Sequence, residues 1–273
     1  MVLAKHGAAW KTRNAGQHQS MNLGTSLVLF GAGLLGGAVN AVAGGATFFT
    51  FPAFMAAGLP AIWANASSSV ALTPGNLGGL LSERAQLPAF DRSLKAQLAL
   101  AMLGGGIGAL LLLYTSDRVF AALVPALIGV ATLVFAVSRP LQDYLRTQTG
   151  GTHHHPRWRL ALFLPTAIYG GYFGAGMGVV MMALFSVTSD WSVRSANAVK
   201  NMMGAAVNWV AIVIFTLQGV VAWPQTLVML TGALIGGYAG GRLLRVVPAP
   251  WIRGFVVAMG LVMTVYYAGK YWF

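Results

Sequence analysis

The stretch Gly36-Gly-Ala-Val-Asn-Ala-Val-Ala-Gly-Gly-Ala-Thr-Phe-Phe-Thr-Phe-Pro52 decides the fold of this chain. It carries no charge, and it changes from small residues to aromatic ones just after Gly45. The pair Gly44-Gly45 interrupts apolar sequence that reaches back to Leu23. A glycine-interrupted apolar segment is typical of the broken helices of membrane transporters.

The rest of the chain is also apolar. Of its 273 residues, 57% are hydrophobic and 8% are charged, whereas soluble domains carry about 25% charged residues. A soluble protein of this length could not cover its surface with so few charges. Because most of its apolar blocks approach the roughly 20 residues needed to cross a bilayer, we expect them to face lipid. The blocks are continuously apolar rather than alternating, which favours helices over barrel strands.

Five apolar blocks precede a basic central segment and five follow it. The blocks are Leu23–Ala43, Thr47–Leu59, Trp63–Leu81, Leu94–Tyr114, Val119–Val137, Leu160–Gly174, Met177–Val187, Ser195–Leu217, Pro224–Leu244 and Trp251–Tyr271. The sequence therefore predicts an all-α polytopic membrane protein with about 8–10 hydrophobic helices. The short second block of each half is either a short span or one arm of a re-entrant hairpin.

The two halves match at a constant offset of 132 residues. Ala64-Asn65-Ala66 matches Ala196-Asn197-Ala198, and Asn76 matches Asn208. Asparagines that recur twice in register indicate an internal duplication. Since each half then makes an odd number of crossings, the two repeats are expected to have inverted topology.

The duplication and the charge pattern together predict the organisation of the chain. Residues 1–22 are a polar, basic tail, and 23–138 form the first transmembrane repeat. Residues 139–159 are a basic linker, and 160–273 form the second repeat. Met21 is a candidate start of translation, so the tail receives little functional weight.

Lysine and arginine are distributed unequally between the two sets of loops. One set contains Arg84, Arg92, Lys95, Arg139, Arg146, Arg157, Arg159, Arg194, Arg242 and Arg245, and the other contains Lys5, Lys11, Arg13, Arg118 and Lys270. Because basic residues accumulate in cytoplasmic loops, we expect the first set, with the central loop, in the cytoplasm of a bacterial inner membrane. The net charge of +12 is then explained by membrane orientation, and no nucleic-acid partner is expected.

Lys200 is the charged residue that lies furthest inside an apolar block. A charge at the centre of a membrane helix costs about 2.5–3.5 kcal/mol on insertion scales. On a helix, Asn197, Lys200 and Asn201 share one face. We interpret this face as a substrate-binding site for an anion; the alternative is a lysine that snorkels to the nearer interface.

The corresponding stretch of the first half has hydroxyl groups in place of the charge. It contains Asn65, Ser67, Ser68 and Ser69, and Ser68 is equivalent to Lys200. A pocket with hydroxyls on one side and an ammonium on the other suits an oxyanion. The alternative explanation is hydrogen bonding between helices, which is common in membranes.

The glycine breaks supply a second element suited to anions. Helices that begin just after Gly45 and Gly176 would present free N–H groups and positive dipole ends. A plain structural kink is the alternative. The other candidate site residues at the breaks are Asn40, Gly44, Thr47 and Tyr172.

Other motifs argue against catalysis and cofactors. The runs Gly104–Gly108 and Gly236–Gly241 lack the lysine and serine of a phosphate-binding loop, so close helix packing explains them. His153, His154 and His155 lie in the central loop without further ligands, and we predict no metal site and no cofactor. All five acids lie in loops or at block edges, which predicts that the protein is not an enzyme and transports without a carboxylate proton switch.

Several motifs resemble those of the TauE/SafE sulfite exporter family. The opening stretch, with Ala57-Gly-Leu-Pro60, Ala64-Asn-Ala-Ser67 and Thr73-Pro-Gly75, is similar to its N-terminal signature. The stretch from Tyr169 to Gly178 and Ala196-Asn-Ala198 resemble its second repeat more loosely. The resemblance covers about residues 23–271 and implies a permease for sulfite or an organosulfonate.

The chain also departs from the family pattern. Ala46 stands where the family often has a third glycine, and Ser67 stands where it often has threonine. Lys200 lies outside the motifs that carry the resemblance, so the identity of the anion stays open.

Three functions are compatible with these observations. The first is a permease that moves sulfite or an organosulfonate by alternating access at the repeat interface. The second is a transporter of another small anion, such as a carboxylate. The third is a non-transporting scaffold subunit, which would need neither paired broken helices nor a lysine inside a helix. The expected partners are the small anion and the lipid bilayer, and a homodimer is a candidate assembly.

Overall fold

The computed structural model of the chain describes residues 21–42, 45–149, 156–243 and 249–273. Within these ranges every regular element is helical. The predicted all-α fold with membrane-spanning helices is therefore confirmed for the part of the chain that the structure describes.

The helices of the two halves follow the same order of long and short elements. The elements are α2 (Leu23–Val42), α3 (Thr47–Ala56), α4 (Ala61–Glu83), the 3-10 turn η1 (Arg84–Gln86), α5 (Arg92–Tyr114), α6 (Asp117–Thr149), α7 (Pro156–Tyr172), α8 (Met177–Thr188), α9 (Val193–Leu217), α10 (Trp223–Leu243) and α11 (Ala249–Tyr271). Helix α6 continues to Thr149, so much of the predicted linker 139–159 is helical. The three central histidines lie outside the described residues.

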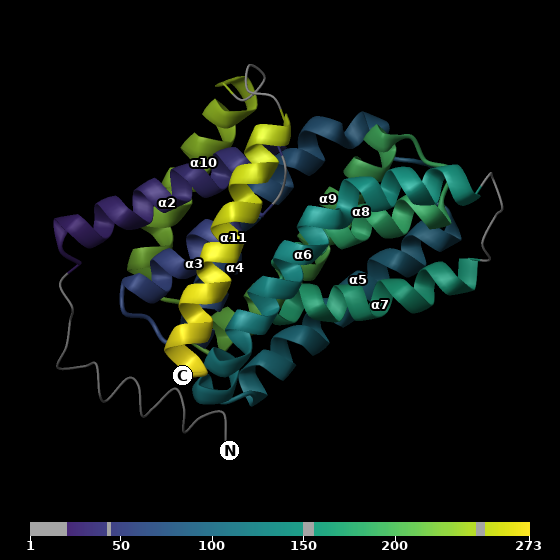
Figure 1. The fold of residues 1–273 in the computed structure, drawn as a ribbon. Coiled ribbons are helices and arrows are strands. Elements are labelled where there is room, and N and C mark those ends of the chain that lie inside the picture. Colours follow the sequence, from purple (N-terminus) through teal and green to yellow (C-terminus); the bar gives the residue numbers. More distant parts are fainter. Residues whose placement is uncertain (1–20, 43–44, 150–155, 244–248) are drawn as a thin grey trace.

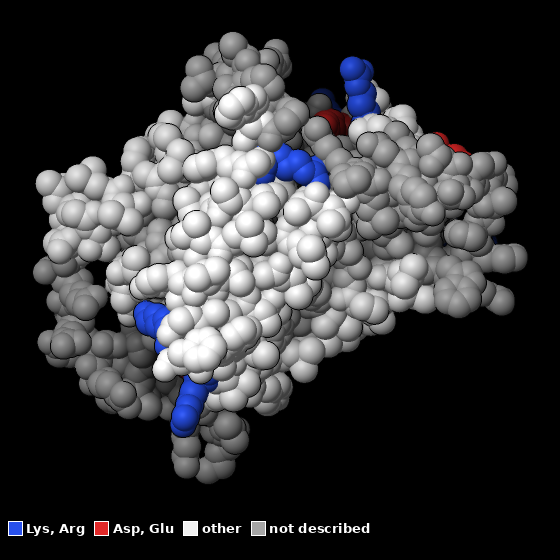
Figure 2. All heavy atoms as spheres, in the orientation of Figure 1, with Lys and Arg blue, Asp and Glu red and all other residues white. Residues whose placement is uncertain are grey.

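The outer surface of the helices fits a bilayer. Among the described residues, α2, α5, α6, α9 and α11 are long and apolar enough to span a membrane. Large apolar side chains on them are exposed, including Leu217 at 80% and Val265 at 72%. Figure 2 shows the charged side chains of one face towards its upper and lower ends, with an uncharged band between them. This distribution leaves apolar surface where the hydrocarbon would lie.

The second helix of each half is too short to cross a bilayer by itself. Helix α3 has 10 residues and α8 has 12, which gives lengths of about 15 and 18 Å against a hydrocarbon thickness of about 30 Å. Helices α2 and α3, and likewise α7 and α8, are therefore the paired arms of broken helices.

The backbone of both breaks uses glycine in the left-handed region. Gly45 has φ 90° and Gly176 has φ 74°, values that cost other residues strain. At the first break, Ala46 O accepts hydrogen bonds from the N–H groups of Phe49 and Thr50, and at the second Gly176 O accepts from Val179 and Val180. These equivalent contacts are offset by 130 residues, so the expected constant offset of 132 is wrong at the breaks, where α8 is two residues longer than α3.

The closest helix pairs join one half to the other. Helix α2 lies along α10, and α7 lies along α5 (Figure 1). Because α2 corresponds to α7 and α10 to α5, the two pairs are equivalent. The equivalent helices α4 and α9 also pack on each other, as do α6 and α11. The two halves therefore interlock along their lengths.

Glycine allows this close approach of the helices. A Cβ atom on Gly37 would collide with the carbonyl oxygen of Ala233, and one on Gly236 would collide with that of Leu34. In the equivalent α5–α7 pair, a Cβ on Gly108 would collide with Ile168 O. Small residues have this role at helix interfaces in membranes, where packing rather than the hydrophobic effect drives association. The predicted packing role is confirmed for Gly108 and Gly236.

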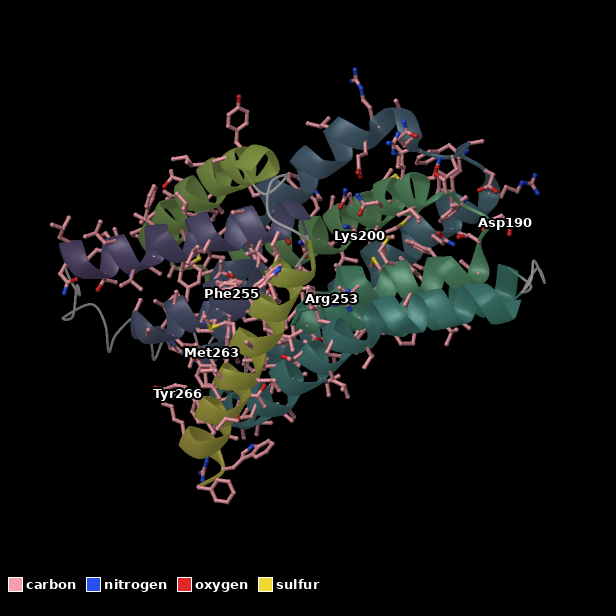
Figure 3. All side chains as sticks on the ribbon, turned by 45° about the horizontal axis from the view of Figure 1, so that its top comes forward. Asp190, Lys200, Arg253, Phe255, Met263 and Tyr266 are labelled. Atoms are coloured by element: carbon pink, nitrogen blue, oxygen red, sulfur yellow. The ribbon has the colours of Figure 1, made fainter. Side chains whose placement is uncertain are left out.

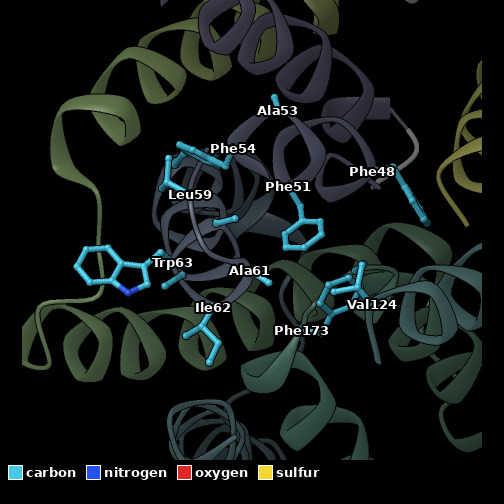
Figure 4. Packing of buried hydrophobic residues seen from close by; sticks show 14 of the residues in the cluster. Phe48, Phe51, Ala53, Phe54, Leu59, Ala61, Ile62, Trp63, Val124 and Phe173 are labelled. Atoms are coloured by element: carbon cyan, nitrogen blue, oxygen red, sulfur yellow. The ribbon is translucent and has the colours of Figure 1, made fainter. Parts of the chain in front are cut away.

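Helix α3 is embedded in the protein. Its side chains from Phe48 to Phe54 are all buried. In Figure 4, Phe48, Phe51 and Phe54 lie among side chains that include Val124 and Phe173. Rings of α3 contact Phe135 on α6 and Phe255 on α11, so this aromatic packing holds α3 against both helices.

Gly236→Ala should destabilise the α2–α10 pair, because the added methyl group meets backbone and not a side chain that can move. We expect a loss of about 1–3 kcal/mol in the free energy of unfolding, as for other overpacked sites. Gly31→Ala, also within this pair, has no atom near the added methyl group and should leave stability unchanged or slightly raised. Unfolding in detergent micelles measures both, and equal losses would contradict the packing argument.

Candidate functional site

Helices α4 and α9 carry most of the predicted site residues and run antiparallel. The end of α4 meets the start of α9, where Glu83 contacts Asn197. The start of α4 meets the segment that follows α9, where Ser67 Oγ accepts a hydrogen bond of 3.0 Å from the Ala222 N–H. Ser68 and Glu83 are fifteen residues apart on α4, or about 22 Å along its axis. The predicted residues therefore fall into two clusters at opposite ends of α4.

The first cluster, which we call the α4 cluster, contains Asn65, Ser67, Ser68 and Ser69. Ser68 Oγ lies 2.6 Å from Thr50 Oγ1 on α3. Ser69 Oγ donates to the backbone oxygen of Asn65 at 3.0 Å. These contacts favour the helix-bonding alternative for the serines, and the structure does not bring Ser68 to Lys200.

Asn65 differs from the serines of the α4 cluster, because its contact reaches the second break. Its Nδ2 donates to Tyr172 O, the last carbonyl of α7, at 3.0 Å. The side chain is 1% exposed, and Oδ1 has no hydrogen-bond partner among the described residues. Asn65 thus satisfies a carbonyl at the end of a broken helix and keeps one acceptor unused.

The first break has its own neighbours. Asn40 Nδ2 lies 3.5 Å from the position that a Cβ on Gly75 would take, which places Asn40 beside the middle of α4. Gly45 packs against Phe48 and Phe135, and Thr47 is the first residue of α3. Gly44 lies outside the described residues.

Arg253 is a second cation inside a predicted span. Its guanidinium donates to the backbone oxygens of Phe135 and Ala136, the latter at 3.3 Å. It also lies over the Phe135 ring, 5.4 Å from the centroid. Arg253 stands only two residues after Trp251, where the apolar block begins, and its position in the sequence gives no sign of these contacts.

The second cluster, which we call the lysine cluster, contains Glu83, Asn197, Lys200, Asn201 and Gly178. Asn197 Nδ2 donates to both carboxylate oxygens of Glu83 at 2.7 Å, and Asn201 Nδ2 donates to Oε2 at 2.9 Å. The predicted shared face of α9 is therefore occupied by a carboxylate from the other half. The sequence predicted Glu83 only as an acid at a block edge. Contacts between the end of one helix and the start of another cannot be read from the sequence.

Lys200 packs against the start of α8. Its Cδ lies 3.3 Å from the position that a Cβ on Gly178 would take, and Figure 3 shows it on α9, well inside the end marked by Asp190. The N–H groups of Met177 and Val179 bond to carbonyls of the break, but the Gly178 N–H has no partner among the described residues. The ammonium, a free N–H and a positive helix end thus lie in one region, which suits an anion.

Lys200 and Glu83 are close without forming an ion pair. Glu83 is held by Asn197 and Asn201, which stand three residues before and one residue after Lys200 on α9. The Lys200 ammonium itself makes no hydrogen bond or ion pair with any described residue. The side chain is partly buried.

A cavity of about 250 Å³ adjoins the second break. It is lined by Val130, Ala131, Val134, Pro165, Thr166, Tyr169, Ala175, Gly176 and Val180. Its wall is mainly apolar, and the Tyr169 hydroxyl is bonded to Ala175 O at 2.7 Å. Within the described residues, no group of acidic or histidine side chains is arranged to hold a metal ion.

Comparison with known families assigns the chain. The family model described as "Sulfite exporter TauE/SafE" matches residues 29–267. The chain belongs to the TauE/SafE family. No solved structure matches it.

Three relatives of this TauE/SafE protein are named as probable membrane transporter proteins. One from Haemophilus influenzae is 27% identical over 246 residues, which cover 89% of this chain and 95% of the relative. YfcA from Escherichia coli K12 is 27% identical over 247 residues, 87% of each chain. ORF9 from a Sinorhizobium species is 26% identical over 249 residues, 87% of this chain and 90% of the relative.

The relatives establish the general class of the protein. It is a bacterial membrane protein of a transporter family, and the relatives' names indicate no enzyme activity. The expectation of a membrane protein of a transporter family is confirmed at this level.

The contact between Glu83 and Asn197 predicts coupled stability effects. Glu83→Ala and Asn197→Ala should each destabilise the protein, and the double variant should lose less than the sum. We expect a coupling energy of about 1–3 kcal/mol, because each single change leaves a hydrogen-bonding group without its partner. Asp91→Ala with Asn197→Ala is the control pair; Asp91 caps α5 through the Leu94 N–H, and its effect should simply add. An additive Glu83–Asn197 pair would contradict the contact.

Proposed function

We propose that this TauE/SafE protein is a permease for a small sulfur-containing anion, sulfite or an organosulfonate, and that Lys200 binds the anion. The observation that carries the proposal is the position of the Lys200 side chain over Gly178 at the start of α8. A substrate there would meet a positive side chain and a free backbone N–H together.

An anion is the ligand that this arrangement would stabilise most. The positive end of a helix dipole and an ammonium both favour negative charge. Hydrogen bonds to a charged partner contribute about 1.5–3 kcal/mol each. A neutral solute would gain no such charge-assisted hydrogen bond from the ammonium.

One observation favours sulfur oxyanions over carboxylates. The family to which the chain belongs is described as a sulfite exporter family. Carboxylates are the second candidate substrates, because the ammonium and the N–H would also bind them.

The transport mechanism we propose is alternating access between two inverted repeats. Support comes from the equivalent helices α4 and α9, which run antiparallel, and from the interlocked pairs α2–α10 and α7–α5. Broken helices in corresponding positions of two repeats are the usual location of a transporter site.

We also propose the inner membrane as the location, with the central loop in the cytoplasm. The contact of Glu83 with Asn197 supports this, because it groups the basic loops 83–93 and 188–194 at one end of the α4–α9 pair. The bond between Ile62 N–H and Asp117, at 3.2 Å, groups 115–118 with the other end.

Single-cysteine labelling tests the topology, since the chain contains no cysteine. Ala89→Cys and Val193→Cys should react with a membrane-impermeant thiol reagent only when the cytoplasmic side is open. Ser116→Cys and Gln218→Cys should react from the outside of intact spheroplasts. If each cysteine reacted from the opposite side of the membrane, the cytoplasmic location of the central loop would be contradicted. If Ala89→Cys and Gln218→Cys reacted from the same side, the arrangement of the spans would be contradicted.

Binding and uptake measurements test the function. Purified protein should bind sulfite or a short alkanesulfonate, and proteoliposomes should take it up. Lys200→Met should weaken binding by at least about tenfold, because a charged hydrogen bond is lost. Lys95→Met is the matched control, since Lys95 is exposed on α5, and should bind normally.

Three results would contradict the proposal. One is the absence of binding or uptake of any sulfur anion by the wild-type protein. Another is anion binding that Lys200→Met leaves unchanged while thermal stability is retained. If the protein instead binds carboxylates more tightly than sulfonates, the second candidate substrate class is favoured.

A further inference from the structure

Glu83 places a fixed negative charge within the proposed site. Three hydrogen bonds from Asn197 and Asn201 hold its carboxylate, at 2.7 to 2.9 Å. Both asparagines come from α9, the helix that carries Lys200, so the carboxylate is tied to the same surface as the ammonium. The end of α4 is the negative end of its dipole and does not stabilise an acid there. The asparagine amides therefore account for the position of the carboxylate.

Glu83 lies against the face of α9 that carries Lys200. The two asparagines that bind it, Asn197 and Asn201, stand three residues before and one residue after Lys200. No described residue forms an ion pair with Lys200. An anion bound by Lys200 would therefore sit within Coulombic range of a carboxylate that two amides keep in place.

We propose that Glu83 tunes the charge selectivity of the anion site, because its carboxylate weakens the binding of divalent sulfur oxyanions relative to monovalent ones. This inference rests on the proposed anion site at Lys200. Repulsion between Glu83 and the ligand grows in proportion to the ligand charge. At about 8 Å and an effective dielectric constant of about 20, each added unit of charge weakens binding roughly thirtyfold.

The other charges near Glu83 do not replace this effect. Arg84 follows it directly, and Arg194 lies near the start of α9, but both are exposed and screened by water and salt. Lys200 attracts a second ligand charge as well as the first, and Glu83 opposes that gain. Removal of the Glu83 charge alone therefore isolates its contribution to selectivity.

Methanesulfonate and sulfate are suitable probes for the experiment. Both are tetrahedral sulfur oxyanions of similar size, one singly and one doubly charged at neutral pH. Equilibrium binding of each is measured on the purified full-length protein. The ratio of the two affinities in the wild-type protein is the reference against which the variants are compared.

Glu83→Gln should shift the ratio of the two affinities towards sulfate by about tenfold or more, because it removes the charge and keeps the size. The glutamine oxygen still accepts hydrogen bonds from Asn197 or Asn201. Asp91→Asn is the matched acid-to-amide control; Asp91 is exposed and caps α5, a role that asparagine also fills. The ratio of methanesulfonate to sulfate affinity in Asp91→Asn should equal that of the wild type.

The outcomes separate this inference from the proposed function. If the wild type binds methanesulfonate, Lys200→Met weakens binding and Glu83→Gln leaves the ratio unchanged, charge selection by Glu83 is overturned and the anion site stands. If the wild type binds neither probe nor any other sulfur anion, both fail. Should Glu83→Gln not fold, Glu83→Met removes the same charge at a similar size, and an unchanged ratio in that variant overturns the inference.

Discussion

Every backbone polar group inside a bilayer must find a partner within the protein, and the two glycine breaks are where this constraint is hardest to meet. Each break stops one helix and starts another, which leaves carbonyl and N–H groups without intrahelical partners. The structure meets part of the requirement locally, because Ala46 O and Gly176 O accept from the first turns of α3 and α8. Another part of the requirement is met by a residue that is distant in the sequence, because Asn65 donates to Tyr172 O at the end of α7. The position of α4 relative to the second break follows from that bond.

The two halves pack closely because glycine residues lie at the contacts between their helices. Helices that carry glycine at their contacts approach until backbone meets backbone, as at Gly37 and Ala233. The equivalent α5–α7 pair repeats this contact with Gly108. Two such pairs flank the α4–α9 pair, in which the polar side chains are concentrated. The site thus lies on helices that are enclosed on both sides by rigid, closely packed neighbours.

The two repeats use equivalent asparagines differently, and this difference creates the site. Asn65 bonds to a carbonyl at the second break, whereas Asn197 bonds to Glu83. In the first half Ser68 bonds to Thr50, whereas its counterpart Lys200 packs over Gly178 with its ammonium unpaired among the described residues. One half therefore uses its polar residues for structure, and the other retains charge that a ligand can meet.

The sequence by itself determined the membrane class, the helical fold, the two breaks and the presence of a charge, Lys200, inside an apolar block. Hydrophobic blocks, glycine pairs and a charge inside an apolar block are local features, and their physical consequences do not depend on distant residues. Only the tertiary structure decided which polar groups meet. Glu83 and Asn197 are 114 residues apart in the chain, and their contact depends on the antiparallel packing of α4 and α9. The same packing separated Ser68 from Lys200, because repeat-related positions on antiparallel helices lie towards opposite ends.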